Sequence, residues 1–170
     1  ANTAGTGSSA VTDCECDAGF SGTITAPADT CAECALGEYS EVAGSATCTA
    51  CPANATTAAT ASTGVTDCLC EPGHVGTIAA PTDTCTACAA GSYKGGVGVG
   101  VCEDCPTSSN TTGTASTAIE DCICDPGHTG TITAPADTCA ACDVGEYKES
   151  PGPAACDQCP ANSNTAATGS

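Results

Sequence analysis

The stretch from Asp67 to Cys88, DCLCEPGHVGTIAAPTDTCTAC, occurs in three similar copies along the chain. The other copies run from Asp13 to Cys34 and from Asp121 to Cys142, so successive copies start 54 residues apart. A fixed period of this length indicates structural repeats that contact mainly their neighbours. We place the repeats at 8–61, 62–115 and 116–169, with residues 1–7 as the tail of a preceding repeat and Ser170 as the start of the next.

Ordinary hydrophobic packing cannot hold a chain of this composition together. Its 170 residues include one Phe, three Tyr and neither Trp nor Met. Small side chains bury little area, and at about 25 cal/mol per Å² they cannot offset roughly 1–2 kcal/mol of backbone entropy per ordered residue. Covalent cross-links must therefore supply much of the stability.

The cysteines recur in each repeat as Cys-x-Cys followed by two Cys-x-x-Cys pairs. An even number above a tenth of the chain is typical of disulfide-stapled modules in an oxidising compartment. Each bridge that closes a loop of about 15 residues contributes on the order of 3 kcal/mol. We therefore expect a protein that is secreted, extracellular or on the cell surface. Its disulfides are expected to use Cys14, Cys16, Cys31, Cys34, Cys48, Cys51, Cys68, Cys70, Cys85, Cys88, Cys102, Cys105, Cys122, Cys124, Cys139, Cys142, Cys156 and Cys159.

The charge balance excludes one class of partner. Twenty acidic residues face only Lys94 and Lys148, which gives a net charge of −18. Such a chain repels phosphate backbones and anionic membrane surfaces, so we expect no nucleic-acid partner. No run of about 18 apolar residues is present, and we expect no membrane insertion.

Turn residues dominate each repeat and predict little regular structure. Gly and Pro follow every Cys-x-Cys pair, and between them β-branched residues come together at 23–25, 77–79 and 131–133, where we expect very short strands. We expect small disulfide-rich repeats, mostly loops and short β-hairpins, in an extended linear array. The single tyrosine of each repeat (Tyr39, Tyr93 or Tyr147) should be its largest packed side chain, laid over a disulfide.

The order of motifs resembles a known module. The second repeat reads Cys85 to Cys88, Gly91 to Tyr93, Cys102 to Cys105 with a following Pro, a Thr-rich tract, and Asp121 to Gly127 at the next border. This order resembles the ephrin-receptor-like cysteine-rich repeat and is similar to EGF-like and tumour-necrosis-receptor-like modules. The near-constant period and the richness in Ala and Thr look more like an extracellular fibre or surface protein of a microbial eukaryote.

The resemblance implies a disulfide pairing. In the EGF-like scheme the bridges are Cys16–Cys31, Cys70–Cys85, Cys124–Cys139, Cys34–Cys51, Cys48–Cys68, Cys88–Cys105, Cys102–Cys122 and Cys142–Cys159. That scheme leaves Cys14 and Cys156, so Cys156 of one copy would meet Cys14 of the next. The alternative is a closed pairing within each six-cysteine block, for which 15 connectivities exist.

Metal-binding interpretations compete with structural ones. The two Cys-x-x-Cys pairs between Cys31 and Cys51 approach zinc-ribbon spacing, but the extra Cys-x-Cys has no place in such a site. His74 and His128 share a repeat position with Phe20, which favours an aromatic ring packed on a turn over a metal or catalytic role.

The recurring aspartates are a second metal candidate. Asp13, Asp29 and their equivalents, with Glu15 and Asp17, offer calcium oxygen ligands, or they bond locally to turn amides, which is the interpretation we favour. No recurring arrangement of nucleophile and base is present. We expect no enzyme activity, no catalytic residue and no cofactor other than covalent glycans.

Two triplets predict N-linked glycans, at Asn54 and Asn110, both in tracts of small hydroxylated residues. The same tracts suit O-linked sugars. The O-glycosylation candidates are Thr56, Thr57, Thr60, Thr111, Thr112, Thr114, Thr165 and Thr168.

These features predict a structural, non-enzymatic glycoprotein. We expect a subunit of an extracellular filament or cell-surface coat, such as a flagellar hair, in which identical subunits stack head-to-tail. The alternative is a receptor or adhesin ectodomain whose variable loops, 42–47 and 95–101, bind a protein or glycan ligand. A weaker option is a stalk that carries an active domain elsewhere.

Overall fold

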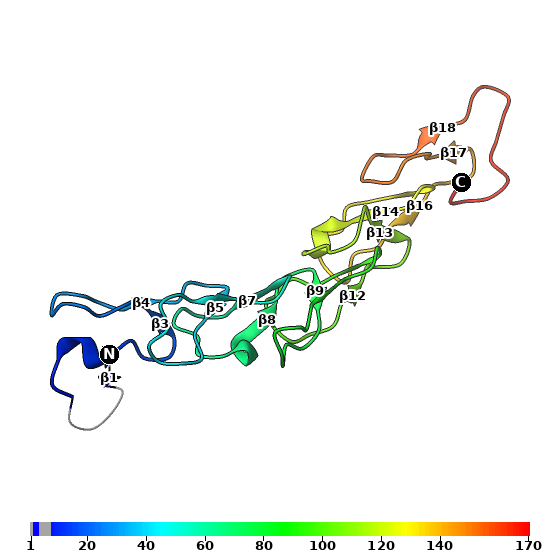
Figure 1. Ribbon diagram of the computed structural model, residues 1–170. Coiled ribbons are helices and arrows are strands. Elements are labelled where there is room, and N and C mark those ends of the chain that lie inside the picture. The colour runs from blue at the N-terminus through cyan, green and yellow to red at the C-terminus, as the bar shows by residue number, and fades with distance from the viewer. Residues whose placement is uncertain (1, 4–7) are drawn as a thin grey trace. The chain divides into compact units, whose positions relative to one another are not determined.

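The computed structural model describes residues 2–3, by their backbone alone, and residues 8–170. Most of the expected tail at 1–7 therefore lies outside the described residues (Figure 1). The chain forms two compact units. The first comprises Ala1–Glu71, Val75–Thr86 and Val97–Val99, and the second comprises Pro72–His74, Ala87–Gly96 and Gly100–Ser170.

Paired short strands are the main regular structure, seen as small arrows in Figure 1. Each pair forms a two-stranded sheet. The pairs are β1 (Asn2–Thr3) with β2 (Cys14–Glu15), β3 (Phe20–Ser21) with β4 (Ala32–Glu33), β5 (Glu38–Tyr39) with β6 (Thr49–Ala50), β7 (Ala55–Thr57) with β8 (Cys68–Cys70), β9 (His74–Val75) with β10 (Thr86–Ala87), β11 (Ser92–Tyr93) with β12 (Glu103–Asp104), β13 (Ser109–Thr111) with β14 (Cys122–Cys124), β15 (His128–Thr129) with β16 (Ala140–Ala141), and β17 (Glu146–Tyr147) with β18 (Asp157–Gln158).

One 3-10 turn precedes each Cys-x-Cys pair: η1 (Val11–Asp13), η2 (Val65–Asp67) and η3 (Ile119–Asp121). The part of the chain at 2–3 and 8–170 contains no α-helix. Small disulfide-rich repeats of short hairpins are therefore confirmed as the fold class. None of the helices at these positions is long and apolar enough to cross a bilayer.

The strands do not lie where the β-branched triplets predicted them. Residues 23–25 are irregular, and the strand is β3, which ends at Ser21. Gly22 has φ +140°, a conformation that ends the strand. The amide of Thr25 then donates to the Asp29 carboxylate at 2.7 Å, so this backbone closes a turn and cannot join a ladder.

The disulfide pattern confirms one part of the expected pairing and corrects the other. The three bridges that follow Cys-x-Cys are present: Cys16–Cys31, Cys70–Cys85 and Cys124–Cys139. The remaining bridges join consecutive cysteines: Cys34–Cys48, Cys51–Cys68, Cys88–Cys102, Cys105–Cys122 and Cys142–Cys156. The expected Cys34–Cys51, Cys48–Cys68, Cys88–Cys105, Cys102–Cys122 and Cys142–Cys159 bridges are wrong.

A hairpin explains the correction. In the β5–β6 ladder Tyr39 faces Thr49, and the amide of Cys51 donates to the carbonyl of Gly37 at 2.8 Å. In this arrangement Cys51 bonds Cys68 of β8, and Cys48 bonds Cys34. All eighteen cysteines lie in the described range, and Cys14 and Cys159, not Cys14 and Cys156, are outside the eight bridges.

The largest side chains that are less than 2% exposed are all half-cystines, and in each unit some of them pack with one tyrosine. The first compact unit packs Tyr39 with Val65, Cys68, Cys70, Ile78 and Cys85. The second unit packs Tyr93 with Cys122 and Ile132. The expected packing of Tyr39 and Tyr93 among disulfides is confirmed, and both clusters contain residues from two successive sequence repeats.

Candidate functional site

The candidate functional site of this chain is the junction between one repeat and the next. Within the first unit, the Cys51–Cys68 bridge crosses the sequence border at 61/62. β7 lies antiparallel to β8, with Thr57 facing Cys68. The second unit repeats this arrangement with Cys105–Cys122 and with Thr111 facing Cys122. Neighbouring repeats are thus joined by a bridge and a strand ladder together.

One glycine organises each junction. Gly37 accepts a hydrogen bond from the Cys51 amide and donates its own N–H to Oγ1 of Thr57 at 3.1 Å. It thereby holds the half-cystine beside the strand that faces Cys68. Its φ of +81° places it in the left-handed region that favours glycine. Gly91 makes the same two contacts with Cys105 and Thr111.

Sequence reasoning missed this role of glycine and threonine. Thr57 and Thr111 are buried, and the Thr57 hydroxyl also donates to the carbonyl of Ala59. The signal was present, because the same position is threonine in every repeat: Thr57, Thr111 and Thr165. A hydroxyl retained at one position of an internal repeat is a candidate structural hydrogen bond.

The two lysines are interior residues. Lys148 is 5% exposed, and its Nζ donates to the carbonyls of His128 at 2.8 Å and Gly152 at 2.6 Å. Lys94 is also buried, and burial lowers the pKa of its ammonium. Ser40 occupies the equivalent position in the first repeat. The two lysine side chains therefore bond to backbone carbonyls in the interior, and the exposed charged side chains are mainly acidic.

The recurring aspartates close turns. Asp29 Oδ2 accepts hydrogen bonds from the amides of Thr25 and Ala26, both at 2.7 Å, and from the Thr25 hydroxyl. These bonds lower the pKa of the carboxyl. The same pattern recurs at Asp13, Asp67, Asp83, Asp121 and Asp137. Local turn bonding is confirmed for these residues.

The metal candidates are not brought together. Nowhere in residues 8–170 do three or more His, Cys, Asp or Glu side chains gather as a metal site would require. The cysteines between Cys31 and Cys51 are in disulfides, so no thiolates are left there for zinc. His74 and His128 each direct Nδ1 to the carbonyl of a proline two residues earlier, at 3.1 and 3.2 Å.

Both predicted N-glycosylation sites are exposed, but in different settings. Asn54 directly precedes β7, and its Nδ2 donates a hydrogen bond to the Cys85 carbonyl at 3.4 Å. Asn110 lies within β13, where its Oδ1 accepts from the Thr111 amide at 2.9 Å. Its Nδ2 makes no hydrogen bond with the described residues.

The O-glycosylation candidates divide by exposure. Thr60, Thr112, Thr114 and Thr168 are exposed, whereas Thr56 and Thr165 are partly buried. Thr57 and Thr111 are buried, and their hydroxyls make hydrogen bonds with backbone groups.

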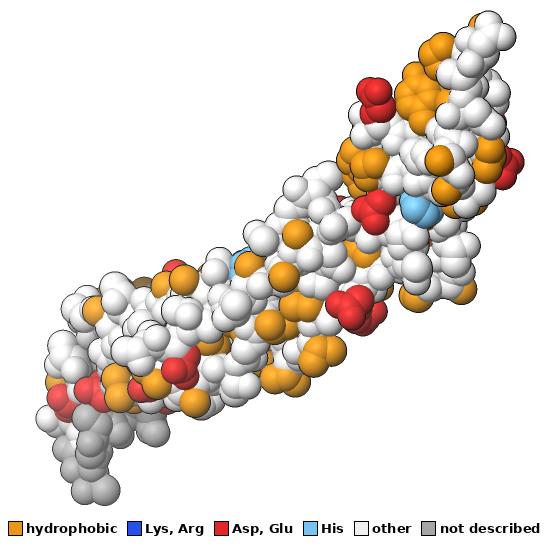
Figure 2. All heavy atoms as spheres, turned by 90° about the vertical axis from the view of Figure 1, so that its right-hand side faces the viewer, with side chains coloured by type: hydrophobic (Ala, Val, Ile, Leu, Met, Phe, Trp, Pro, Cys, Tyr) orange, Lys and Arg blue, Asp and Glu red, His pale blue; other side chains and the backbone are white. Residues whose placement is uncertain are grey.

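Apolar side chains are exposed in the variable loops named above. Val42 is 65% exposed in the first loop, and Val99 and Val101 are 78% and 77% exposed in the second. On the face shown in Figure 2, hydrophobic and acidic side chains are interspersed among other side chains and backbone atoms. The loops are therefore accessible, as the ligand-binding alternative requires.

The comparisons with known proteins agree with the motif order. Residues 22–68, 76–122 and 130–170 match the family described as tyrosine-protein kinase ephrin type A/B receptor-like. These segments cover more than half of the chain, which therefore belongs to the family of ephrin-receptor-like cysteine-rich repeats. A search of curated proteins returns no match. The family assignment defines a small disulfide-rich repeat module of a kind that is typically extracellular, with no catalytic domain family identified.

Proposed function

We propose that this chain is a structural, non-enzymatic glycosylated subunit of an extracellular filament or cell-surface coat, in which identical subunits stack head-to-tail. The observation that supports this proposal is the junction. Its disulfide and its strand ladder each join a residue of one repeat to a residue of the next. A force that pulls neighbouring repeats apart is then resisted by a disulfide and by backbone hydrogen bonds, and not by apolar packing alone. That property suits a fibre.

The surface chemistry supports the same role. The net charge is −18 and both lysines are buried, so the solvent-facing charges are predominantly negative. Like charge keeps neighbouring fibres apart and hydrated. Glycans on the exposed Asn110 and on the exposed threonines would extend that hydrated layer.

Immunogold labelling of cells that make the protein tests the proposal. We expect gold particles along extracellular fibres or over a continuous surface coat. Particles confined to intracellular compartments of cells at steady state would contradict it. Negative-stain microscopy of the secreted chain adds a second reading, with linear assemblies that lengthen as the concentration rises.

The exposed valines favour a second candidate, a ligand-binding or adhesive ectodomain. Val99 and Val101 expose apolar side chains to solvent in one loop, as a binding surface does. Binding of the chain to glycan and cell-surface protein arrays, compared with a Val99→Ser/Val101→Ser variant, tests it. Binding that the double substitution abolishes would support this alternative.

A further inference from the structure

The disulfides between Cys16 and Cys156 form one continuous series. Every bridge joins a cysteine to the next bridged cysteine along the sequence, so no bridge encloses a cysteine of another. Each bridge closes a loop with a sequence separation of 14, 15 or 17, and its two Cα atoms lie 5.6–5.8 Å apart. We call the residues between the two cysteines of a bridge a bridged loop. A covalent path through the sulfurs bypasses it.

Short strands connect each bridge to the next. Two residues separate Cys31 from Cys34, and a single residue separates Cys68 from Cys70. A strand rises about 3.2–3.4 Å per residue and is close to full extension, so these connections have little length to give under tension. We call the eight bridges and the connecting strands the disulfide spine. Its strands are β4, β6, β8, β10, β12, β14 and β16.

Each strand of the spine pairs with a strand of the bridged loop that precedes it. β4 pairs with β3, which lies in the loop closed by Cys16–Cys31, and β6 pairs with β5, which lies in the loop closed by Cys34–Cys48. The same order continues to β16, which pairs with β15. These ladders hold the bridged loops against the spine, whereas the covalent path along the spine does not pass through the loops.

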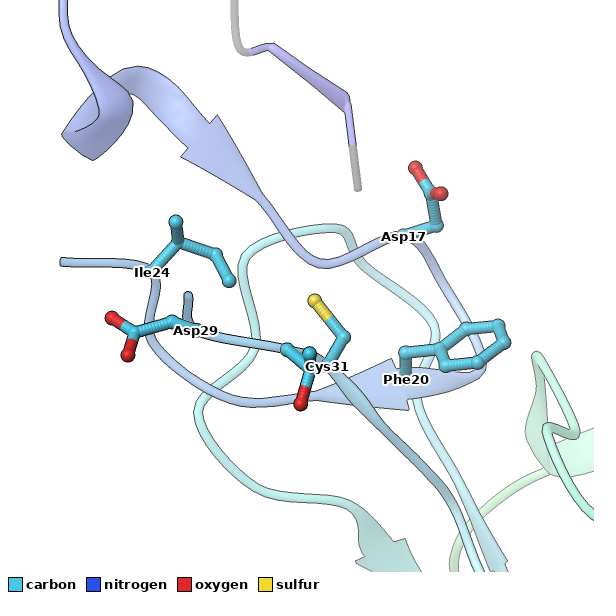
Figure 3. Close-up of a pocket in the computed structure, with 6 residues that line it drawn as sticks. Asp17, Phe20, Ile24, Asp29 and Cys31 are labelled. Atoms are coloured by element: carbon cyan, nitrogen blue, oxygen red, sulfur yellow. The ribbon is translucent and has the colours of Figure 1, made fainter. Parts of the chain in front are cut away.

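The bridged loops carry the features that a sugar or a partner would reach. Asn54, Asn110 and the variable loops 42–47 and 95–101 all lie inside them. A cavity of about 300 Å³ lies on the loop closed by Cys16–Cys31 (Figure 3). Changes in these features therefore leave the covalent path of the spine unaltered. The cavity is lined by Asp17, Phe20, Ile24, Asp29, Thr30 and Cys31.

We propose that the disulfide spine carries tension along this chain, and that a bridged loop adds its length to the stretched chain only after its bridge is reduced. The proposal deepens the proposed structural function and rests on it for the source of the tension. Opening one bridge adds about 40–55 Å to the fully stretched chain, because the extended loop replaces the short span between the two Cα atoms. Thiols in the surroundings thereby set how far the chain extends.

The release step is a thiol–disulfide exchange. A dithiol such as dithiothreitol transfers two electrons and two protons to one bridge, which becomes two thiols, while the dithiol closes into a cyclic disulfide. The exchange begins with attack of a thiolate on one sulfur and passes through a mixed disulfide, so its rate depends on access to that sulfur.

Single-molecule stretching of the 170-residue chain between terminal peptide tags tests the spine. Cys14→Ser and Cys159→Ser together give a background without free thiols that exchange with the bridges. Ten Gly and Ser residues are inserted after Val42, which is 65% exposed in a bridged loop. The fully stretched length of the oxidised chain should not change. After reduction the same insertion should add about 35 Å.

Removing one bridge gives the matched comparison. In the same background, Cys34→Ala with Cys48→Ala opens one bridged loop, and the oxidised chain should stretch by a further 40–45 Å or about that. Val42→Ser, in the same loop, is the control and should stretch no further than the background. Peptide mapping must find the other bridges in the double variant. If it pairs its cysteines wrongly, the insertion alone decides.

Burial predicts which loop is released last. Cys70 and Cys85 are 1% and 4% exposed, whereas each of the other bridges has one partly exposed cysteine. Under limiting dithiothreitol, alkylation of the new thiols followed by mass spectrometry should therefore label Cys70 and Cys85 most slowly. Early labelling of this pair would contradict release controlled by access.

Two stretching results would overturn the spine. An oxidised chain that lengthens by the inserted residues would show that the bridged loop bears the tension. A correctly paired Cys34→Ala/Cys48→Ala variant that stretches no further than the background would show the same. Either result leaves the structural function standing, because gold labelling of fibres does not depend on the load path. Labelling confined to intracellular compartments would refute the structural function and leave the stretching results unchanged.

Discussion

The amide of Gly37 donates a 3.1 Å hydrogen bond to Oγ1 of Thr57, twenty residues further along the chain. Through this bond the β5–β6 hairpin is held against the strand that faces Cys68. The Cys51 amide donates to the carbonyl of the same glycine. The backbone of Gly37 therefore contacts both Cys51 and the strand that faces Cys68.

Thr57→Val should destabilise the junction while preserving its shape. The substitution leaves the part-buried Gly37 amide without its acceptor, which costs up to about 3 kcal/mol. Thermal unfolding followed by calorimetry under non-reducing conditions should show a lower midpoint. Thr66→Val, at an exposed hydroxyl in η2, is the control and should leave the midpoint nearly unchanged. Equal effects of the two substitutions would refute the role of the hydroxyl.

Gly73→Ala should be more damaging than an ordinary surface substitution. Gly73 has φ +75°, and a Cβ there would lie 2.3 Å from the carbonyl oxygen of Ala115. The left-handed backbone alone costs an alanine roughly 1–2 kcal/mol, and the contact forces a backbone shift in addition. We expect a low yield of correctly bridged protein, measured by disulfide mapping. Gly113→Ala, where a Cβ meets nothing within 4 Å, should give the normal yield.

Stability should fall in acid because of the turn-closing aspartates. Amide donors lower the pKa of Asp29 and Asp83 below the value in the unfolded chain. A lowered folded pKa contributes stability that is fully present above the unfolded pKa, about 4, and that is lost as the pH falls toward the folded value. The thermal unfolding midpoint should therefore be lower at about pH 3 than at about pH 7.

Replacing one of these carboxyls gives the matched comparison. Asp83→Asn should lower the midpoint at neutral pH and reduce the further loss in acid, because the amide oxygen is a weaker acceptor that does not titrate. Asp143→Asn, at an exposed carboxyl, should preserve the acid response. An Asp83→Asn variant with the full acid response would refute the assignment.

Glycan occupancy should be higher at Asn110 than at Asn54. Asn54 Nδ2 is bonded to Cys85 inside the junction, whereas Asn110 Nδ2 makes no such contact with the described residues. Mass spectrometry of protein from a secretory host should find more glycan at Asn110. Thr112→Ala and Thr56→Ala remove each acceptor triplet while keeping its asparagine, so each should abolish glycan at one site alone. Higher occupancy at Asn54 would contradict the argument.

The turn chemistry could be predicted from residues, but the position of the strands could not. Asp29 was identified as a turn residue, and its carboxylate accepts hydrogen bonds from the amide and the hydroxyl of Thr25. The Ile24 region was expected to be a strand because β-branched residues favour extended backbone. The strand lies earlier, at β3, because Gly22 and the Asp29 carboxylate take that backbone out of the ladder.

The period, the oxidising setting and the reliance on disulfides could be predicted from composition and from the spacing of the cysteines, and the order of motifs resembles the family of module. The pairing of Cys51 with Cys68, which leaves Cys14 and Cys159 outside the eight bridges, became evident in the folded chain alone. Several partners satisfy the same spacing, and a bond forms only where a hairpin brings two sulfurs together. Here the Gly37 and Thr57 contact holds the hairpin of Cys51 beside the strand that faces Cys68.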